Sequence, residues 1–460
     1  MVNLKCKSCG AEIKFNPDSQ KLVCEHCGTS YSVDDLNDES TKANADFENT
    51  TNTKSYTCSN CGATLLTFDD TAVTFCSYCG SSMVIEPQLY KGRKPDYIIP
   101  FKITKEECEK IYRKYVNKFP FAPNYLKDNY TISKFRGIYM PYGMYSAEHH
   151  GIQYNTGDKY SYRTFNYRYY KKYAILANID ASYDGIPFDL SSQFQDSFSQ
   201  AIAPFDMSEA VPFDDKYISG YYADRADVVG KTYTDDVRET VKSIVEKDFK
   251  KVRLFRKYGC FSPKLTLNVI NKKAVYYPVY FLAIKSSNNT ISYAVINGQN
   301  GKIAVEMPID YKKYFIFSLL LSIPIFILLN YKLELTLVPN SVATIALLWS
   351  IINLYIFRVQ NTKIHNKYKR TDDKGYWSNK NLKEVDENVH APSCIKIVLG
   401  IIISVAVLLI NPVQDLYYYG ASILAMIMVL MSVFDLVKQY NLLAGRKLSQ
   451  LGKRGGDENE

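Results

Sequence analysis

The sequence lacks several features that would assign it to a common class of protein. No G-x-x-x-x-G-K-[ST] phosphate loop occurs, which argues against a P-loop ATPase or helicase. The opening residues MVNLKCKSCG contain no apolar stretch after the first charge, so they do not form a secretory signal and we expect the cysteines to begin in the cytosol. Beyond Glu148-His149-His150, no second cluster of His, Asp or Glu stands at ligand spacing.

The average composition conceals two unlike halves of the chain. With 22% charged residues and a mean hydropathy of -0.20, the 460 residues look like an ordinary soluble protein. Up to about residue 310 the chain is polar and rich in tyrosine, whereas the last third alternates apolar runs with basic segments. The net charge of +9 suits binding either to nucleic acid or to an anionic membrane surface. The positions of the basic residues along the chain have to distinguish these two partners.

Cysteine spacing is the sharpest signal. Four C-x-x-C pairs are each followed by glycine, and fourteen residues separate the pairs within each of two copies. This spacing is just below the usual range of about 15 to 20 residues for a four-cysteine zinc site, and glycine after the second ligand allows the tight turn. Disulfides or a redox pair are less compatible with a reducing cytosol. The predicted ligands of two structural zinc ions are Cys6, Cys9, Cys24, Cys27, Cys58, Cys61, Cys76 and Cys79.

Each set of four thiolates would fill the tetrahedral coordination of zinc and leave no open position for water, so both sites are expected to be structural rather than catalytic. His26 lies inside the second knuckle and is interpreted as an exposed loop residue. Asn16-Pro17-Asp18 and Asp69-Asp70 supply the hairpin turns. The remaining cysteines, Cys108, Cys260 and Cys394, are interpreted as buried or membrane cysteines.

The two zinc ribbons are predicted to fold independently and to be joined by a flexible linker. Ribbon 1 covers residues 1–33, an acidic linker poor in apolar residues covers 34–55, and ribbon 2 covers 56–86. Each ribbon is too short for an adequate core, so metal binding should supply its folding free energy. We expect no core shared with the rest of the chain, so that a chain starting near Lys91 would keep its soluble domain.

A soluble α+β domain is predicted over residues 95–310. Thr104 and Glu107 form a capping box that begins one helix, and the segment DDVRETVKSIVEKDFKKVRLF predicts another. Each helix leads into a Tyr-rich extended segment, IYMPYGMY or VYYPVYFL, which suggests a weak internal repeat with an edge-type proline. Asn297-Gly298 to Asn300-Gly301 predicts a hairpin turn.

Two features of this domain allow a functional interpretation beside a structural one. In GDKYSYRTFNYRYYKKY, basic and aromatic residues alternate, as they do where proteins grip single-stranded nucleic acid, but a half-buried strand gives the same pattern and is favoured. His149-His150 after Glu148 could hold a metal or act as a base. An ordinary loop is the favoured interpretation.

Four apolar runs after residue 310 predict four membrane spans in two tight hairpins, over residues 311–357 and 394–438. The connection 358–393 and the tail 439–460 are rich in Lys and Arg, so the positive-inside rule places both, and hence both termini, in the cytoplasm. Lys396 and Asp435 lie near span ends, where they can reach the interface. Pro324 alone would give a kink and no pathway. A membrane anchor is therefore favoured over a transporter.

The layout as a whole resembles a bacterial family of membrane-anchored zinc-ribbon proteins. Tandem C-x-x-C-G ribbons, then IIPFKITKEE, FAPNYLK, GIYMPYGMY, PFDDKYISGYYAD and YPVYFLAIK, then membrane helices, look like the YdjG type, whose members are often labelled TFIIB-type zinc-ribbon or primosomal-helicase-like. The resemblance implies a non-enzymatic membrane protein, with PspA-like, flotillin-like and TPM-domain proteins of envelope stress as possible partners. The absent phosphate loop gives the helicase label no support.

The sequence thus predicts a multidomain, multi-pass protein of the cell membrane, with tandem zinc ribbons, a soluble α+β domain and a C-terminal four-helix transmembrane region. We expect an adaptor that binds cytoplasmic or membrane proteins through its ribbons and its α+β domain. A membrane-tethered nucleic-acid-binding protein is the alternative, and a small-molecule transporter is the third. The sequence names neither the partner nor the oligomeric state.

Overall fold

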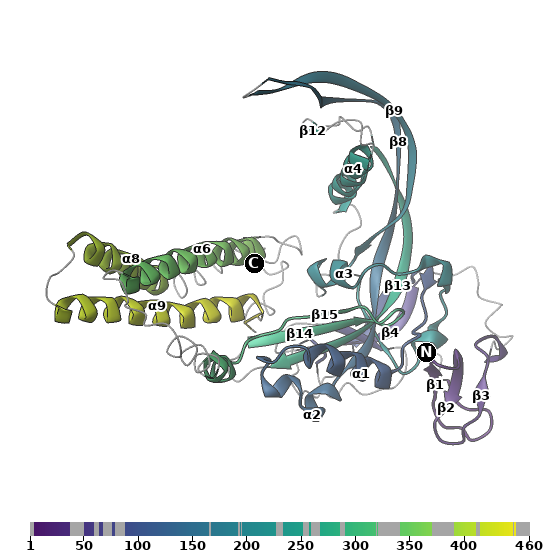
Figure 1. The fold of residues 1–460 in the computed structure, drawn as a ribbon. Coiled ribbons are helices and arrows are strands. Elements are labelled where there is room, and N and C mark those ends of the chain that lie inside the picture. The colour runs from purple at the N-terminus through teal and green to yellow at the C-terminus, as the bar shows by residue number, and fades with distance from the viewer. Residues whose placement is uncertain are drawn as a thin grey trace, which may run out of the picture.

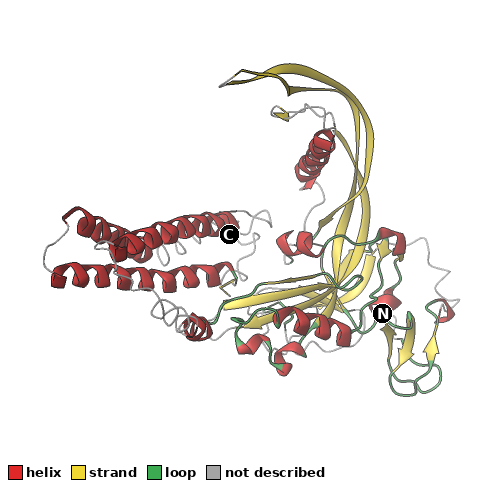
Figure 2. Cartoon of the chain, viewed as in Figure 1, coloured by secondary structure: helices red, strands yellow, loops and turns green. Residues whose placement is uncertain are grey.

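The structure is a computed structural model in which a small sheet, a large central sheet and a group of long helices follow one another along the chain (Figure 1, Figure 2). The residues that it describes are 4–36, 50–58, 64–67, 76–78, 88–164, 167–191, 194, 196–226, 233–251, 257–258, 267–285, 290–318, 320, 341–369, 391–410, 415–444 and 446–447.

Ribbon 1 forms an antiparallel sheet of β1 (Ile13–Asn16), β2 (Lys21–Cys24) and β3 (Ser30–Tyr31), followed by the short helix η1 (Asp34–Leu36). The turn between β1 and β2 lies at the predicted Asn16-Pro17-Asp18. There the Asn16 side-chain oxygen accepts hydrogen bonds from the amides of Asp18 and Ser19, at 2.9 and 3.2 Å. The local turn chemistry was therefore readable from the sequence.

Within the described residues the central sheet has 13 strands, with β10-β7-β13-β8-β11-β5-β4-β6 in order along its main path. The long strands β8 and β13 lie at its centre and pair antiparallel from Arg136 to His149 of β8. The strands are β4 (Thr50–Thr57), β5 (Thr64–Thr67), β6 (Gln88–Arg93), β7 (Tyr97–Ile98), β8 (Arg136–Thr164), β9 (Tyr167–Asp189), β10 (Val211–Pro212), β11 (Tyr222–Asp224), β12 (Lys257–Tyr258), β13 (Leu267–Lys285), β14 (Thr290–Asn297), β15 (Ile303–Val305) and β16 (Arg446–Lys447).

Helices flank this sheet, and both predicted helices occur. In α1 (Lys105–Val116) the Thr104 hydroxyl accepts from the Glu107 amide and the Glu107 carboxylate accepts from the Thr104 amide, so the predicted capping box is confirmed. The second predicted helix is α4 (Thr234–Lys251). The other short helices are η3 (Asn124–Leu126), α2 (Asn129–Ile132), α3 (Asp196–Ile202), η4 (Met207–Glu209) and η5 (Asp215–Ile218).

The predicted edge position of the two prolines is wrong, because β8 and β13 are interior strands. Pro141 and Pro278 occupy equivalent places: Pro141 faces Tyr276, and Pro278 faces Tyr139. On the side away from β13, β8 pairs with β11 before Pro141 and with β9 after it. On the side away from β8, β13 pairs with β7 before Pro278 and with β14 after it. The missing amide of each proline therefore falls at a gap between two ladders, where no hydrogen bond is lost.

The predicted hairpin at Asn297 is confirmed, because β14 and β15 pair antiparallel on either side of it. Two core clusters lie on the faces of the sheet. One contains Phe101, Tyr112 and Tyr139 under α1. The other contains Tyr277 and Phe281 and includes residues of ribbon 2. Many of the described tyrosines thus serve as core residues, which explains part of the tyrosine content of this half of the chain.

The expectation that ribbon 2 shares no core with the soluble domain is wrong. Strands β4 and β5 belong to the central sheet, where β5 pairs with β11. The first of them starts at Thr50, inside the segment predicted as linker, and residues 37–49 lie outside the described part of the chain. Tyr56, Leu65 and Tyr78 are buried in the same cluster as Tyr277. Removing residues before Lys91 would therefore open the core of the domain.

Strands β8 and β9 run past the body of the sheet as a long hairpin. They stay paired from Tyr142 with Asp189 to Thr164 with Tyr167. At about 3.3 Å per residue, the stretch from Ala147 to Thr164 spans roughly 55 Å. The predicted strand in the Tyr-rich segment is confirmed, but the described tyrosines there are exposed rather than half-buried. His149 and His150 lie in β8 and not in a loop.

Three long helices, α6 (Ser341–Lys369), α8 (Ala391–Ile410) and α9 (Asp415–Leu443), pack together as a bundle at one end of the molecule (Figure 1). Among the described residues, the segment Ile423–Asn441 of α9 is long and apolar enough to cross a membrane, and Lys396–Ile410 is a shorter apolar helix. Of the first predicted span, residues 314–318 and 320 are helical and the rest lies outside the described residues.

The bundle is joined to the central sheet by hydrogen bonds as well as by the chain. The Asn441 side chain near the end of α9 accepts from the Ile309 amide at 2.7 Å and donates to the Ile309 carbonyl at 2.9 Å. Directly after α9, β16 pairs with β14. The end of α9 is therefore attached to the central sheet by these hydrogen bonds and by the pairing of β16 with β14.

Candidate metal centre

Two knuckles of identical backbone form bring together the four cysteines of ribbon 1. In the first, the Gly10 amide donates to the Cys6 carbonyl at 2.8 Å, and in the second the Gly28 amide donates to the Cys24 carbonyl at 2.9 Å. Both glycines have a positive φ, 73° and 75°, which a residue with a Cβ rarely adopts. The C-x-x-C-G pattern therefore fixes the turn that aims both sulfurs of a pair at one point.

The four sulfur atoms lie within 4.8 Å of one another and could hold a metal ion. Across the knuckles, Cys6 Sγ lies 3.5 Å from Cys27 Sγ, and Cys9 Sγ lies 3.5 Å from Cys24 Sγ. None of the four forms a disulfide. A tetrahedral zinc ion with bonds of about 2.3 Å to sulfur requires sulfur separations of about 3.8 Å. The observed spacing fits such an ion, and four soft thiolates favour zinc over hard cations.

Hydroxyl groups contact two of the sulfurs. Tyr31 Oη lies 3.3 Å from Cys6 Sγ, and Thr29 Oγ1 lies 3.1 Å from Cys27 Sγ. The Tyr31 contact, against an opposing effect of burial, lowers the pKa of the Cys6 thiol to about 5. The Thr29 contacts lower the pKa of Cys27. Both groups favour the thiolate, which is the form that binds metal.

The Cys9 thiol behaves in the opposite way. A hydrogen bond with the Ala11 backbone favours its thiolate, but the neighbouring Cys27 and Cys24 thiols and burial outweigh it and raise the pKa of Cys9 to about 12. Four sulfurs this close cannot all carry a negative charge without a cation among them. The arrangement is therefore one that a divalent ion would complete.

Ribbon 1 has a small core of its own. Cys6 and Cys24 are buried together with Ile13, Phe15 and Leu22, whereas Cys9 and Cys27 are exposed on the outer side. His26 is exposed, as predicted. A core of this size supplies little stability, so metal binding would contribute much of the folding free energy of this segment.

Ribbon 1 also rests on the body through η5 and the residues after it. The Ser219 hydroxyl donates to the Ile13 carbonyl at 2.6 Å, and the Phe15 amide donates to the Ser219 carbonyl at 3.1 Å. The Phe15 and Tyr217 rings meet edge to face at 5.3 Å, and the Gln20 side-chain Nε2 donates to the Phe101 carbonyl at 2.8 Å. Ribbon 1 is thus a docked module with its exposed cysteines turned outward.

The second set of cysteines is described only in part. Cys58 and Cys76 are buried at 2% and 1% exposure within the core of the body, whereas Cys61 and Cys79 lie outside the described residues. Tyr78, between the last two cysteines of the motif, donates its hydroxyl to Asp224 Oδ2 at 2.7 Å, and both side chains are buried. The metal site predicted at these four positions stays a prediction.

Sequence reasoning missed the residues that support these cysteines. Tyr31, Thr29 and Tyr78 lie within four residues of a cysteine, but nothing in the spacing shows that their hydroxyl groups turn toward the sulfurs or toward the core. Asp224 is 146 residues from Tyr78, so no local signal could have found that pair. Of the other cysteines, Cys108 is buried as predicted. Cys260 and the side chain of Cys394 lie outside what the structure describes.

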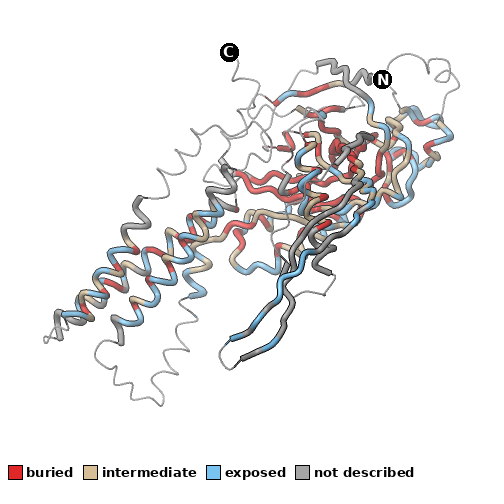
Figure 3. Tube along the Cα trace, turned by 90° about the horizontal axis from the view of Figure 1, so that it is seen from above, coloured by how far each residue is buried: buried red, intermediate tan, exposed pale blue. Residues whose placement is uncertain are grey.

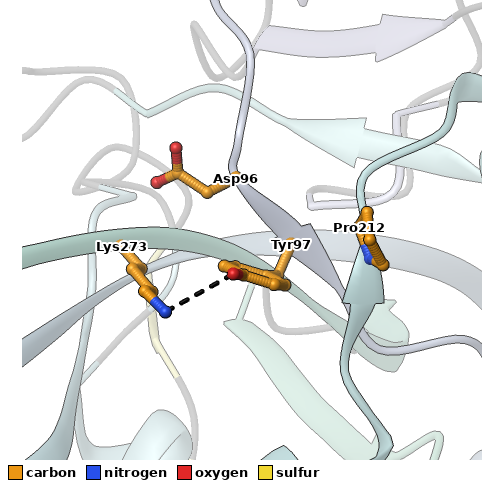
Figure 4. A pocket seen from close by; sticks show the side chains of 4 residues that line it. All are labelled: Asp96, Tyr97, Pro212 and Lys273. Atoms are coloured by element: carbon orange, nitrogen blue, oxygen red, sulfur yellow. Dashed lines mark hydrogen bonds between the residues drawn. The ribbon is translucent and has the colours of Figure 1, made fainter.

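A pocket of about 290 Å³ lies beside the junction of β7, β10 and β13, lined by Asp96, Tyr97, Pro212 and Lys273 (Figure 4). The Lys273 ammonium lies 3.4 Å from Tyr97 Oη and 4.8 Å from the centre of that ring. Asp96 Oδ2 accepts from the Ala274 amide at 2.7 Å. These contacts tie β7 to β13, so the polar groups of the pocket are engaged in holding the sheet together.

Comparison with known proteins gives one relative to report. The chain is 25% identical to the uncharacterized protein YdjG of Bacillus subtilis (strain 168) over 328 residues, which is 67% of this chain and 91% of the relative. No family model matches the chain, and no solved structure matches it significantly. The similarity supports the resemblance to YdjG-like proteins seen in the sequence and extends over most of the relative.

Proposed function

We propose that the protein is a multi-pass membrane adaptor that presents a zinc ribbon to the cytoplasm. Its four predicted spans would hold the α+β body at the membrane surface, with both termini in the cytoplasm, and two structural zinc ions would be bound per chain. The observation that carries this proposal is the burial pattern of the bundle, whose outer surface is apolar and whose interior holds polar as well as apolar side chains.

The outer surface of the bundle is covered by large apolar side chains. In a water-soluble bundle such residues would point inward, because burying each of them contributes about 1.5–3 kcal/mol. An apolar surface this continuous fits a lipid environment. The exposed residues include Ile345, Leu348, Trp349, Ile352, Tyr355, Leu399, Ile402, Leu409, Ile423, Ile427, Leu430 and Phe434.

Small and polar residues lie in the interior of the same bundle, beside apolar ones such as Phe357, Ile397 and Leu436. Asn353 of α6 donates to the Ser432 hydroxyl of α9 at 2.9 Å, and both side chains are buried. Ser350 and Ser404 are also buried, and their hydroxyl groups donate to backbone carbonyls of their own helices. Small residues and hydrogen bonds between helices are the usual means of helix association in a bilayer.

The charged residues of the spans also fit this environment. Lys396 and Asp435, predicted separately to reach the interface, form an ion pair at 3.0 Å between α8 and α9. Pairing neutralises two charges that would be expensive to bury singly. The predicted basic connection 358–393 begins within α6, whose helix continues to Lys369, and the predicted basic tail begins in the last residues of α9. The positive-inside rule assigns both to the cytoplasm.

The position of ribbon 1 supports a recruiting role. In Figure 1 its strands lie at the opposite end of the body from α6, α8 and α9, so ribbon 1, with its exposed Cys9 and Cys27, lies far from the proposed membrane. A structural zinc site holds a small, rigid surface of this kind without a large core. We therefore assign protein recruitment to ribbon 1, with envelope-stress proteins as the partners that the family resemblance suggests.

Topology labelling in intact cells tests the membrane part of the proposal. Single cysteines placed at Leu333 and Gln414, in the two short turns between spans, should react with an impermeant thiol reagent from outside. A cysteine placed at Lys374 in the basic connection should react only after the cells are opened. The opposite labelling pattern, or equal labelling at all three positions, would contradict the proposed arrangement of four spans.

A further inference from the structure

We propose that the outer end of the β8–β9 hairpin binds the anionic surface of the membrane in which the bundle sits. This inference rests on the proposed membrane insertion and adds a second lipid contact, away from the spans. The hairpin tip is defined here as residues 159–164 of β8 and 167–173 of β9.

The first argument is the direction in which the hairpin extends. Figure 1 shows β8 and β9 rising from the body and bending toward the side on which α6, α8 and α9 lie. Figure 3, seen from above, shows the hairpin and the helices leaving the body in the same general direction. A bilayer that surrounds the bundle would therefore meet the hairpin tip, which β8 reaches after roughly 55 Å of curved strand from Ala147.

The second argument is the chemistry of the exposed side chains. Tyr162, Tyr167, Tyr169 and Tyr173 are exposed, Tyr167 to 69% and Tyr162 to 56%. The Tyr162 and Tyr169 rings stack at 4.6 Å across the two strands and form one aromatic surface. Tyrosine, with an apolar ring and a polar hydroxyl, is enriched where protein crosses from water to lipid.

The third argument is charge. The tip contains no acidic residue. Its register places Lys159 opposite Lys171 and Arg163 opposite Arg168, whereas Lys172 lies opposite Asp158, just outside the tip; Lys171 and Lys172 are exposed. Like charges directly opposite one another destabilise an isolated hairpin. Anionic headgroups would relieve this repulsion, because basic residues close to such a surface are attracted to it.

The fourth argument is that, among the described residues, no third strand pairs with the tip. The third strand β13 accompanies β8 only as far as His149, and the two residues of β12 pair with Gly157 and Asp158. Beyond them the described tip is two-stranded, and two-stranded hairpins are marginally stable in water. A surface that covers the tyrosines would stabilise the tip. Nucleic acid could satisfy the same charges, but the orientation toward the bundle favours the membrane.

The test places a fluorescent reporter at the tip of the full chain in nanodiscs. The chain has two tryptophans, Trp349 and Trp377. In a Trp349→Phe, Trp377→Phe background, Tyr167→Trp should be quenched by lipids brominated near the headgroup end of their acyl chains. We expect at least twofold stronger quenching in discs of phosphatidylcholine and phosphatidylglycerol than in phosphatidylcholine alone. Adding Lys171→Glu and Lys172→Glu should remove that difference.

Two controls separate this inference from the proposed insertion. Trp349, kept in a Trp377→Phe chain, reports the bundle, and Lys21→Trp in the same doubly substituted background reports the far end of the body, where no quenching is expected. If Trp349 is quenched and the tip is not, the tip inference is overturned while the insertion stands. If Trp349 is not quenched by lipids brominated near the ends of their acyl chains, which lie at the depth of the middle of a span, the proposed insertion fails. A tip that responds to a single-stranded oligonucleotide and not to lipid would overturn the inference in favour of nucleic acid.

Discussion

The two four-cysteine segments share one spacing and differ in everything that surrounds them. Ribbon 1 keeps a core of its own around Ile13 and Leu22 and rests on the body through a few contacts. Ribbon 2 contributes Tyr56, Leu65 and Tyr78 to the main core, and β4 and β5 to the main sheet. The spacing of cysteines thus predicts how sulfurs are arranged, but it carries no information on what the intervening strands pair with.

Removing the segments by truncation should show the largest difference between them, measured as the stability of the remaining body. A chain starting at Asp34 should keep a folded body, because it loses only the docking contacts of ribbon 1. A chain starting at Lys91 loses β4, β5 and part of the main core, so its body should lose cooperative unfolding. Limited proteolysis and thermal unfolding of both chains in detergent would measure this. Equal resistance of the two bodies would show that ribbon 2 is dispensable.

Substitution of one buried cysteine in each segment should give the next largest difference. Cys76→Ser should destabilise the body by about 4 kcal/mol or more, as expected where a metal site inside a core is lost. Cys24→Ser should unfold ribbon 1 alone and lower the zinc content from two ions per chain to about one. Hydrogen exchange locates the effect, and elemental analysis counts the metal. If the Cys24→Ser variant lost amide protection from hydrogen exchange across the whole body, ribbon 1 would not unfold independently of the body.

The buried pair of Tyr78 and Asp224 offers a smaller change in ribbon 2. Tyr78→Phe removes the hydroxyl that donates to Asp224 and should lower the free energy of unfolding of the body by roughly 1.5–3 kcal/mol, the range for a hydrogen bond to a charged group. Chemical denaturation measures it. Tyr130→Phe, at a hydroxyl on the exposed surface of α2, is the matched control and should change nothing.

The corresponding change in ribbon 1 should be visible only in metal binding. Tyr31→Phe removes the hydroxyl that contacts Cys6 Sγ and should weaken zinc binding by about tenfold, as is typical when a group that supports a metal ligand is lost. Competition with a chelator of known affinity measures this. The stability of the body should not change, and a large drop in its unfolding temperature would mean that ribbon 1 is not a separate module.

What the sequence could predict follows from how local each signal is. The capping box at Thr104, the turn at Asn16 and the hairpin at Asn297 each depend on a few neighbouring residues, and all three are observed. The four-cysteine cluster of ribbon 1 is similarly local, because each knuckle spans five residues and a short hairpin joins them.

The features that could not be predicted depend on contacts between distant segments. Pro141 and Pro278 were predicted to mark edges, but each lies where an interior strand changes its neighbour, which no local pattern records. The ion pair of Lys396 with Asp435 joins two residues that are 39 positions apart in sequence and lie in different helices. The same limit explains why ribbon 2 was predicted to fold as a separate unit, because β11, the strand that pairs with its β5, comes more than 150 residues later.

The central claim is that ribbon 1 is the recruiting surface of a membrane-held body, and in-cell crosslinking tests it most directly. The full chain should be compared with the chain starting at Asp34, with both at equal abundance in the membrane fraction and both bodies protease-resistant. We predict that cytosolic proteins crosslinked to the full chain fall at least tenfold with the shorter chain. Capture of the same proteins in equal amounts by both chains would contradict the claim and assign recruitment to the α+β body.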